Sequence, residues 1–144
     1  MPCMGLYFVN EAAFELPDIG LVDRTEHQIE ATLPSGDLLA LQVHREPIPE
    51  GASLGEVVGE NLRWAERQLP AHSVVFRRES EIAGCPALEV GVTWKGEAGL
   101  VYTRQAHLDA QGTWIVFSGN APLEEREACD ALVERAVATF RLRD

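Results

Sequence analysis

Apolar and polar residues alternate in short runs along most of this chain, and a period of two residues is typical of β-strands. In the first third of the sequence, the runs predict strands at 6–9, 13–16, 27–33 and 38–46. In the second half, they predict strands at about 73–81, 86–95, 99–108 and 113–119. Turn-forming residues separate the runs, as in Pro-Ser-Gly at 34–36. The pattern therefore predicts hairpins built from short strands.

Two stretches lack this alternation and carry helix signals instead. Ser53 is followed three residues later by Glu56, which is the signature of a capping box, and Pro70 ends the stretch, so we predict a helix over 53–69. Pro122 and the two glutamates that follow it fit the first turn of a closing helix. Along that helix, apolar residues recur every four positions, at Ala128, Leu132, Ala136 and Phe140.

The order of these elements (strands, helix, strands, helix) with short turns between strands predicts an α+β fold. We expect a curved and mainly antiparallel sheet with the two long helices packed beside it as a sandwich. The chain has 144 residues, which is enough for a hydrophobic core, and it contains neither an internal repeat nor a linker. We therefore expect a single domain over residues 1–144.

The charge balance argues against some classes of partner. The chain carries 23 acidic and 12 basic residues and a net charge of −11, so phosphate backbones and anionic lipid surfaces would be repelled. We therefore expect neither nucleic acid as a partner nor direct insertion into a membrane. The sequence has no run of about eighteen apolar residues, and its start lacks the features of a secretory signal.

The cysteines indicate a reducing environment. Cys3, Cys85 and Cys129 are too few for a disulfide framework, and none belongs to a Cys-x-x-Cys pair, so we expect reduced thiols and a cytoplasmic location. Cys85 stands between Gly84 and Pro86 in a predicted turn. We interpret it as a packing residue rather than a reactive thiol.

Familiar catalytic and metal-binding patterns are missing from the sequence. None of the four histidines, His27, His44, His72 and His107, belongs to a recognisable metal-ligand pattern with another His, Cys or carboxylate. No nucleophile elbow, phosphate-binding loop, dinucleotide fingerprint or zinc-protease motif occurs either. We therefore expect no enzymatic activity, no metal and no cofactor. One alternative stays open, a small enzyme whose acid–base groups include His107 and Glu89.

The tryptophans have two interpretations. Trp94 ends an apolar strand face that begins at Leu88, and Trp64 lies on the first predicted helix. Trp114 begins the strand at 113–119 and is expected to join the same core. We interpret these residues as core residues, with an aromatic ligand cage as the alternative.

One face of the strand at 99–108 fits neither a core nor an ordinary solvent face. Its side chains are Val101, Thr103, Gln105 and His107. Core faces mostly carry aliphatic residues and solvent faces mostly carry charges. We therefore expect something other than the ordinary core or bulk solvent to meet this face.

A second amide lies in an apolar setting on the first helix. Asn61 falls within or at the edge of the apolar stripe that runs from Val58 to Leu69. A buried amide without a partner costs roughly 1–3 kcal/mol, so Asn61 must be bonded, lie at a rim or face a docking surface. With Gln105, it suggests a shallow apolar trough that holds two amides. The alternative is that Asn61 caps a backbone group while Gln105 lies on a solvated sheet face.

Several stretches of the chain resemble the Eag chaperones, small cytoplasmic proteins of the DcrB-related, PsbP-like fold that are encoded beside type VI secretion effectors. The matching stretches are NEAAFELPD at 10–18, DRT at 23–25, ENLRWAERQLP at 60–70, GCPALEV at 84–90 and the pair Arg104–Gln105. Their order and spacing extend the similarity over nearly the whole chain.

The resemblance implies a binding protein without a catalytic step. Eag chaperones hold the apolar N-terminal transmembrane helices of PAAR or Rhs effectors in solution before export, in a groove between the concave face of the sheet and the long helix. By this similarity, the groove-lining amides fall at Asn61 and Gln105, helix contacts at Ala65 and Leu69, and a strand contact at Val101. Because one groove covers only one side of a helix, we also expect a homodimer.

The chain departs from the family pattern near the expected groove. Relatives carry aliphatic residues after the DRT-like segment and on the following strand, where this sequence has Glu26, Gln28 and Gln42. We include Gln28 and Gln42 in the expected client-binding set. We expect either a more polar client or a client that binds at a different position in the groove. A competing function is an adaptor of the same architecture that binds a folded protein through its acidic surface, with a salt-sensitive affinity.

Overall fold

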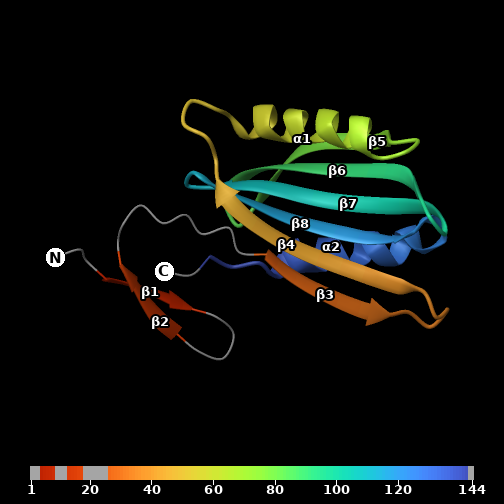
Figure 1. Cartoon of the computed structure of the whole chain (residues 1–144), viewed down its shortest axis with the longest axis horizontal. Coiled ribbons are helices and arrows are strands. Elements are labelled where there is room, and N and C mark those ends of the chain that lie inside the picture. Colours follow the sequence, from red (N-terminus) through yellow and green to blue (C-terminus); the bar gives the residue numbers. More distant parts are fainter. Residues whose placement is uncertain (1–3, 9–12, 18–25, 143–144) are drawn as a thin grey trace.

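The computed structural model describes residues 4–8, 13–17 and 26–142, and it describes side chains from residue 26 onward. Figure 1 shows how the elements follow one another. The strands are β1 (Met4–Phe8), β2 (Ala13–Pro17), β3 (Glu26–Thr32), β4 (Leu38–Pro47), β5 (Ser73–Ile82), β6 (Cys85–Gly96), β7 (Gly99–Ala110) and β8 (Thr113–Pro122). The helices are α1 (Leu54–Gln68), the short 3-10 helix η1 (Leu123–Glu125) and α2 (Arg126–Thr139).

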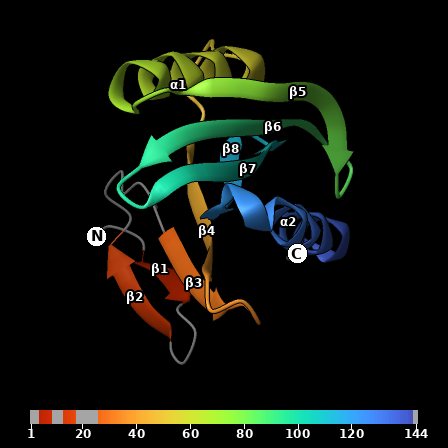
Figure 2. The same cartoon turned by 90° about the vertical axis from the view of Figure 1, so that its right-hand side faces the viewer.

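The strands form two antiparallel sheets. Six strands pair in the order β3-β4-β8-β7-β6-β5, while β1 and β2 pair with each other in a separate two-stranded sheet. Within the larger sheet, neighbours in space are also neighbours in sequence except where β4 pairs with β8, because the chain leaves the sheet after β4 to form α1. Figure 2 shows the curvature of the sheet and the helices beside it. The predicted α+β class, with a curved antiparallel sheet and two long helices, is confirmed.

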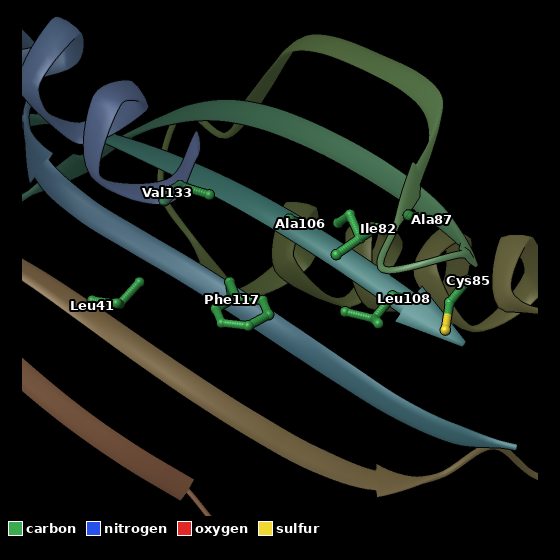
Figure 3. Close-up of a cluster of buried hydrophobic side chains, with 8 residues drawn as sticks. All are labelled: Leu41, Ile82, Cys85, Ala87, Ala106, Leu108, Phe117 and Val133. Carbon is green, nitrogen blue, oxygen red and sulfur yellow. The ribbon is translucent and has the colours of Figure 1, made fainter. Parts of the chain in front are cut away.

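The two helices pack on opposite faces of the six-stranded sheet. α1 packs on the face where β6 carries Leu88, Val90 and Val92. α2 packs on the other face, where Val133 belongs to one buried cluster with Phe117 of β8 (Figure 3). Since successive side chains along a strand point to opposite faces, each residue of β6, β7 and β8 faces one helix layer or the other.

Helix α1 has the predicted boundaries. Ser53 is the N-cap, its hydroxyl accepts a hydrogen bond from the backbone N–H of Glu56 at 3.2 Å, and Leu69 is the C-cap. The buried residues of α1 all lie in its first two turns, at Leu54, Val57 and Val58. The second half of the helix is therefore only partly covered by the sheet.

The closing helix begins later than predicted. Pro122 is the last residue of β8 rather than part of a helical turn, and the glutamates behind it belong to η1. The reason is that the β7–β8 ladder continues to the pair Val101 and Pro122, which keeps this segment extended. Within α2, the fully buried side chains are Cys129 and Val133. The predicted apolar line of Ala128, Leu132, Ala136 and Phe140 flanks them and is only partly buried.

Cys85 has the predicted packing role. The turn before it lies at Ala83 and Gly84, which both have positive φ, so it falls one residue earlier than predicted and Cys85 opens β6. The Cys85 thiol is free and buried, and so is that of Cys129. Cys3 lies outside the described residues, as do the DRT stretch at 23–25 and parts of the stretch at 10–18.

Gly119 of β8 lies so close to α2 that it leaves no room for a side chain. A Cβ atom there would lie 2.8 Å from Cγ2 of Val133 and 3.0 Å from Sγ of Cys129. We expect Gly119→Ala to lower the free energy of unfolding by about 1–3 kcal/mol, because α2 would have to move outward. Urea unfolding followed by circular dichroism measures this loss.

The matched control is Gly55→Ala in the first turn of α1. The nearest atoms to a Cβ there lie at 3.9 Å, and alanine favours a helix, so stability should stay the same or rise slightly. Equal stability of the Gly119→Ala protein and the wild type would contradict the close approach of α2.

Candidate functional site

The unusual side chains of β7 lie on the face of the sheet beside α1, beyond the part that α1 covers. Gln105 of β7 is paired with Ser118 of β8, and Ser118 is paired with Gln42 of β4. Directly paired residues share a face of the sheet, so a polar row crosses three strands here. The face that the sequence left unexplained therefore lies next to a helix and is partly open, with Val101 and Gln105 partly exposed and Thr103 and His107 buried.

Two adjoining hollows make this surface into a trough. The central hollow has a volume of about 280 Å³ and is lined by Glu26, Gln42, His44, Glu46, Asn61, Gln105, His107, Trp114, Val116 and Ser118. The outer hollow, of about 530 Å³, shares Glu46, Asn61 and Trp114 with it and is also lined by Pro47, Pro49, Val57, Glu60, Arg63, Trp64 and Arg67. We call the two hollows together the trough.

A relay of hydrogen bonds forms the floor of the central hollow. Trp114 Nε1 donates to His107 Nδ1 at 3.1 Å, and His107 Nε2 lies 3.0 Å from Gln105 Oε1. The rings of Trp114 and His107 are also stacked, with their centroids 5.8 Å apart. His107 is only 1% exposed, whereas Gln105 is partly exposed. The relay therefore runs from the core to the surface of the trough.

The relay depends on a neutral imidazole. Burial, together with the Arg77 guanidinium, lowers the pKa of His107 to about 4. At neutral pH the ring is uncharged, so one ring nitrogen donates and the other accepts. A protonated ring would instead direct an N–H group at the indole N–H of Trp114, and the first bond of the relay would be lost.

Further along the same face, the surface becomes apolar. Trp94 Nε1 donates to Thr103 Oγ1 at 3.1 Å, and the Thr103 hydroxyl donates to Asn120 Oδ1 at 2.6 Å. Beyond this pair, Val101 and Leu100 line a hollow of about 450 Å³ at the β6–β7 turn, which we call the hairpin hollow. Leu100 is 48% exposed.

The two amides singled out by the sequence meet in the trough. Asn61 is partly buried, and its side-chain amide has no hydrogen-bond partner among the described residues. Asn61 therefore caps no backbone group of the described residues, contrary to that half of the alternative. Gln105 uses its carbonyl oxygen in the relay, and its amide nitrogen has no partner among the same residues. Polar atoms of both amides are thus available to a ligand.

Of the two glutamines in the expected client-binding set, Gln28 and Gln42, only one lines the trough. Gln42 lines the central hollow with Asn61 and Gln105. Gln28 is paired with Gln42 and shares its face, but it is exposed on the edge strand β3 and lines no part of the trough. Gln42 therefore contributes a polar side chain to the central hollow, whereas Gln28 lies outside it.

The expected apolar contacts are not part of the trough. Ala65 and Leu69 are partly buried on α1 but line neither of its hollows, and Val101 lines the hairpin hollow. The helix residues that do line the outer hollow are Val57, Glu60, Asn61, Arg63, Trp64 and Arg67. Most of them recur at spacings of three and four residues, as Val57, Asn61 and Trp64 do, so they share one helix face that could have been found in the sequence.

The interpretation of Trp64 as a core residue is wrong. Its side chain is 55% exposed at the outer hollow, because the sheet covers only the first two turns of α1. Trp114 is buried and Trp94 is partly buried against the α1 cluster, so the core interpretation is confirmed for these two. Trp64 is an exposed aromatic residue of the outer hollow that the sequence argument missed.

The trough is more polar than the sequence predicted. The carboxylates of Glu26 and Glu46 and the imidazole of His44 lie beside the amides in the central hollow. His44 Nε2 and Glu46 Oε2 are 3.4 Å apart. The outer hollow sets the exposed Trp64 among the charged residues Glu60, Arg63 and Arg67, and apolar surface is concentrated in the hairpin hollow.

The opposite face of β7 holds a buried arginine. Arg104 is 3% exposed, and it donates to Glu89 Oε1 at 2.6 Å and to Asp130 Oδ1 of α2 at 3.3 Å. The Tyr102 hydroxyl donates to the same Asp130 oxygen at 2.7 Å. Although burial raises it, the pKa of Glu89 is held below its usual value by Arg104, and burial with Asp130 raises the pKa of Tyr102 to about 12. These bonds fasten α2 to the sheet.

The acid–base pair of the enzyme alternative does not form. His107 is paired with Leu88, which faces α1, so the next residue along β6, Glu89, faces α2 on the other side of the sheet. In the part of the chain that the structure describes, no group of three or more His, Cys, Asp or Glu residues is arranged to hold a metal ion. No helix among those residues has the length and apolar character needed to cross a membrane.

Comparisons with solved structures define the class of fold. PA94, a protein of unknown function from Pseudomonas aeruginosa, matches with a TM-score of 0.85 at 20% sequence identity, over 98% of this chain and 98% of its own. The cyanobacterial PsbP of Synechocystis sp. PCC 6803, CyanoP, matches with a TM-score of 0.55 at 11% identity, over 96% of this chain and 91% of its own. The fold is PsbP-like, as the resemblance implied.

The family follows from the sequence comparison. The DcrB family profile matches residues 11–141, which is nearly the whole chain. The chain belongs to the DcrB family. A search of curated proteins gave no match. The DcrB-related part of the predicted resemblance is confirmed, and the narrower relation to Eag chaperones stays a prediction.

Acidification should weaken the fold through His107. The pKa of this residue falls from 6.5 to about 4 on folding, so between these values the unfolded chain binds a proton that the folded chain does not. The stability contributed by the neutral ring is therefore complete above pH 6.5 and is lost as the pH falls toward 4. We expect the wild type to lose about 3 kcal/mol more than His107→Gln between neutral pH and pH 4, as measured by urea unfolding.

His27→Gln provides the control, because His27 is exposed on β3. This variant should keep the pH dependence of the wild type. If His107→Gln kept it as well, the buried neutral state of His107 would be refuted.

Proposed function

We propose that this DcrB-family protein is a cytoplasmic chaperone that binds the apolar N-terminal transmembrane segments of a type VI secretion effector of the PAAR or Rhs class and shields them before export. It acts by binding alone, without a catalytic step and without a cofactor. The observation that carries this proposal is the meeting of Asn61 and Gln105, from a helix and a distant strand, in one open hollow with unpartnered amide atoms.

The hollows extend along a large part of a helix that spans a membrane. From Val101, in the hairpin hollow, to His107, in the central hollow, β7 makes six steps of about 3.3 Å, or roughly 20 Å. The hydrocarbon core of a bilayer is about 30 Å thick, so this stretch covers about two thirds of a transmembrane helix. The trough and the hairpin hollow together extend along this strand.

The polar centre of the trough restricts the kind of helix that fits. A client with leucines throughout would leave the amides of Asn61 and Gln105 without partners, and burying an unpaired amide costs roughly 1–3 kcal/mol. A client with small or hydroxyl-bearing residues at its middle and large apolar residues at its ends would pair with the amides and with Trp64 and Val101. The proposed client is therefore an apolar helix with a polar centre.

A homodimer completes the proposal. One trough can cover only one side of a helix, and a second copy of the chain would cover another side. The net charge of −11 would then keep the loaded complex in solution.

The test is co-expression with an effector N-terminal segment fused to a soluble carrier protein. We expect the wild type to hold the fusion in the soluble fraction and to co-purify with it. The double variant Asn61→Ala with Gln105→Ala should retain about tenfold less of the fusion, because two amide contacts are lost.

The matched control is Gln68→Ala with Gln111→Ala, which removes two exposed amides outside the trough. This control should co-purify with the fusion like the wild type. Unchanged capture by the Asn61 and Gln105 double variant would argue against the trough as the client site. A complex that is weakened by salt and indifferent to detergent would favour the acidic-surface adaptor instead.

A further inference from the structure

We propose that Trp114 and His107 are positioning residues that fix the Gln105 amide with its NH₂ group directed to the trough, so that this site recognises hydrogen-bond acceptors on its ligand. The orientation of the amide is a property of the free protein. The identity of the ligand as an apolar helix rests on the proposed function.

The first step of the argument is the role of Trp114. An indole nitrogen carries a hydrogen and has no acceptor lone pair in its plane, so it can only donate. Trp114 Nε1 lies 3.1 Å from His107 Nδ1, and this bond is buried. Nδ1 of His107 must therefore be the acceptor, without a hydrogen of its own.

The second step follows from the single hydrogen of a neutral imidazole. If Nδ1 has none, Nε2 carries it, and Nε2 must donate to the Gln105 atom 3.0 Å away. That atom is the carbonyl oxygen, Oε1. Rotating the amide by half a turn would direct an NH₂ group at the N–H group of His107, and both donors would then lack an acceptor.

The third step concerns the group that remains. With Oε1 bonded to His107, the NH₂ group of Gln105 is directed away from the imidazole, and no described residue accepts from it. Gln105 is partly exposed in the central hollow. Asn61, on the other wall, has no partner that fixes its amide, so it is free to present either atom. The trough thus combines one fixed donor with one adaptable amide.

The ligand chemistry follows from this fixed donor. An apolar helix can offer it the side-chain oxygen of Ser or Thr, or a backbone carbonyl left accessible beside a small residue. A group that only donates, such as an indole, would find no acceptor in the NH₂ group of Gln105 and would have to pair with Asn61 or the carboxylates instead. At the position of Gln105, the site therefore favours an acceptor on the client.

The orientation is tested on the free protein by long-range ¹⁵N–¹H correlation spectra of His107. We expect a protonated Nε2 and an unprotonated Nδ1 in the wild type at neutral pH. Trp114→Phe keeps an aromatic ring but removes the indole donor, and it should yield a mixture of the two tautomers. A protonated Nδ1 in the wild type, or an unchanged tautomer in Trp114→Phe, would overturn the positioning role.

The selectivity is tested with two synthetic apolar helices that differ in one central residue, O-methylserine or norvaline. The two side chains have the same shape, but only the first has an acceptor oxygen, and it has no donor. We expect the wild type to bind the O-methylserine helix about fivefold more tightly, as one hydrogen bond allows. Gln105→Glu keeps an acceptor for His107 and removes the donor, so it should lose this preference.

Gln111→Glu is the matched control, because it adds the same charge at an exposed turn outside the trough and should keep the preference. A preference that survives in Gln105→Glu, or a wild type that favours norvaline, would overturn the proposed donor. A wild type that binds neither helix would refute the proposed function and the ligand class with it, while the spectra would still decide the orientation of Gln105.

Discussion

The alternation of side chains along β7 is the constraint on which both layers of this protein depend. Tyr102 and Arg104 face α2, whereas Gln105 and His107 face the trough, and neighbouring strands pair with β7 along nearly its whole length. A shift of the strand by one residue would exchange these two sets. It would turn the guanidinium of Arg104 away from Glu89, leave that carboxylate with the exposed Arg78 at 3.5 Å, and break a buried charge pair, which costs several kcal/mol. The ion pair on one face therefore also secures the amide on the other.

Polar groups are buried on both faces of β7, but they are satisfied in different ways. On the α2 side, the charges of Arg104, Glu89 and Asp130 are paired in one network that joins the helix to the sheet, although the buried Nε of Arg104 has no partner. On the trough side, the relay from Trp114 through His107 ends at Gln105 and leaves a donor at a partly exposed surface. Buried paired charges hold the fold together, whereas a donor at an open surface can be completed by a ligand. The two faces of one strand thus carry a structural network and the proposed binding surface.

The proposed chaperone role requires an acidic protein to bind an apolar segment. The trough is polar at its centre, with Glu26, Glu46 and Gln42 beside the amides, and its outer hollow sets Trp64 among charged residues, whereas the hairpin hollow is mostly apolar. A uniformly apolar groove would bind many exposed apolar segments and would promote self-association. A polar centre reduces that risk and makes binding depend on the sequence of the client. The PsbP-like fold of this DcrB-family protein supplies the scaffold, and the trough would supply the selectivity of the proposed chaperone.

The sequence by itself determined the elements and their order, because alternation, turn residues and the Ser53 cap are local signals that the chain carries wherever it folds. It also identified Asn61 and Gln105 as amides in apolar settings. It did not determine which face of α1 meets the trough, since the apolar stripe from Val58 to Leu69 seemed to be that face. Only the docking of α1 on β6 turned Asn61 and Trp64 outward.

The relay was likewise decided by the tertiary structure alone. Trp114 and His107 are seven residues apart and belong to two strands, so they meet only when the β7–β8 ladder sets their register. A single strand reveals that Gln105 and His107 share a face, but not which partner fixes the imidazole. Contacts of this kind depend on pairing between segments, and residue spacing within one segment carries no information about them.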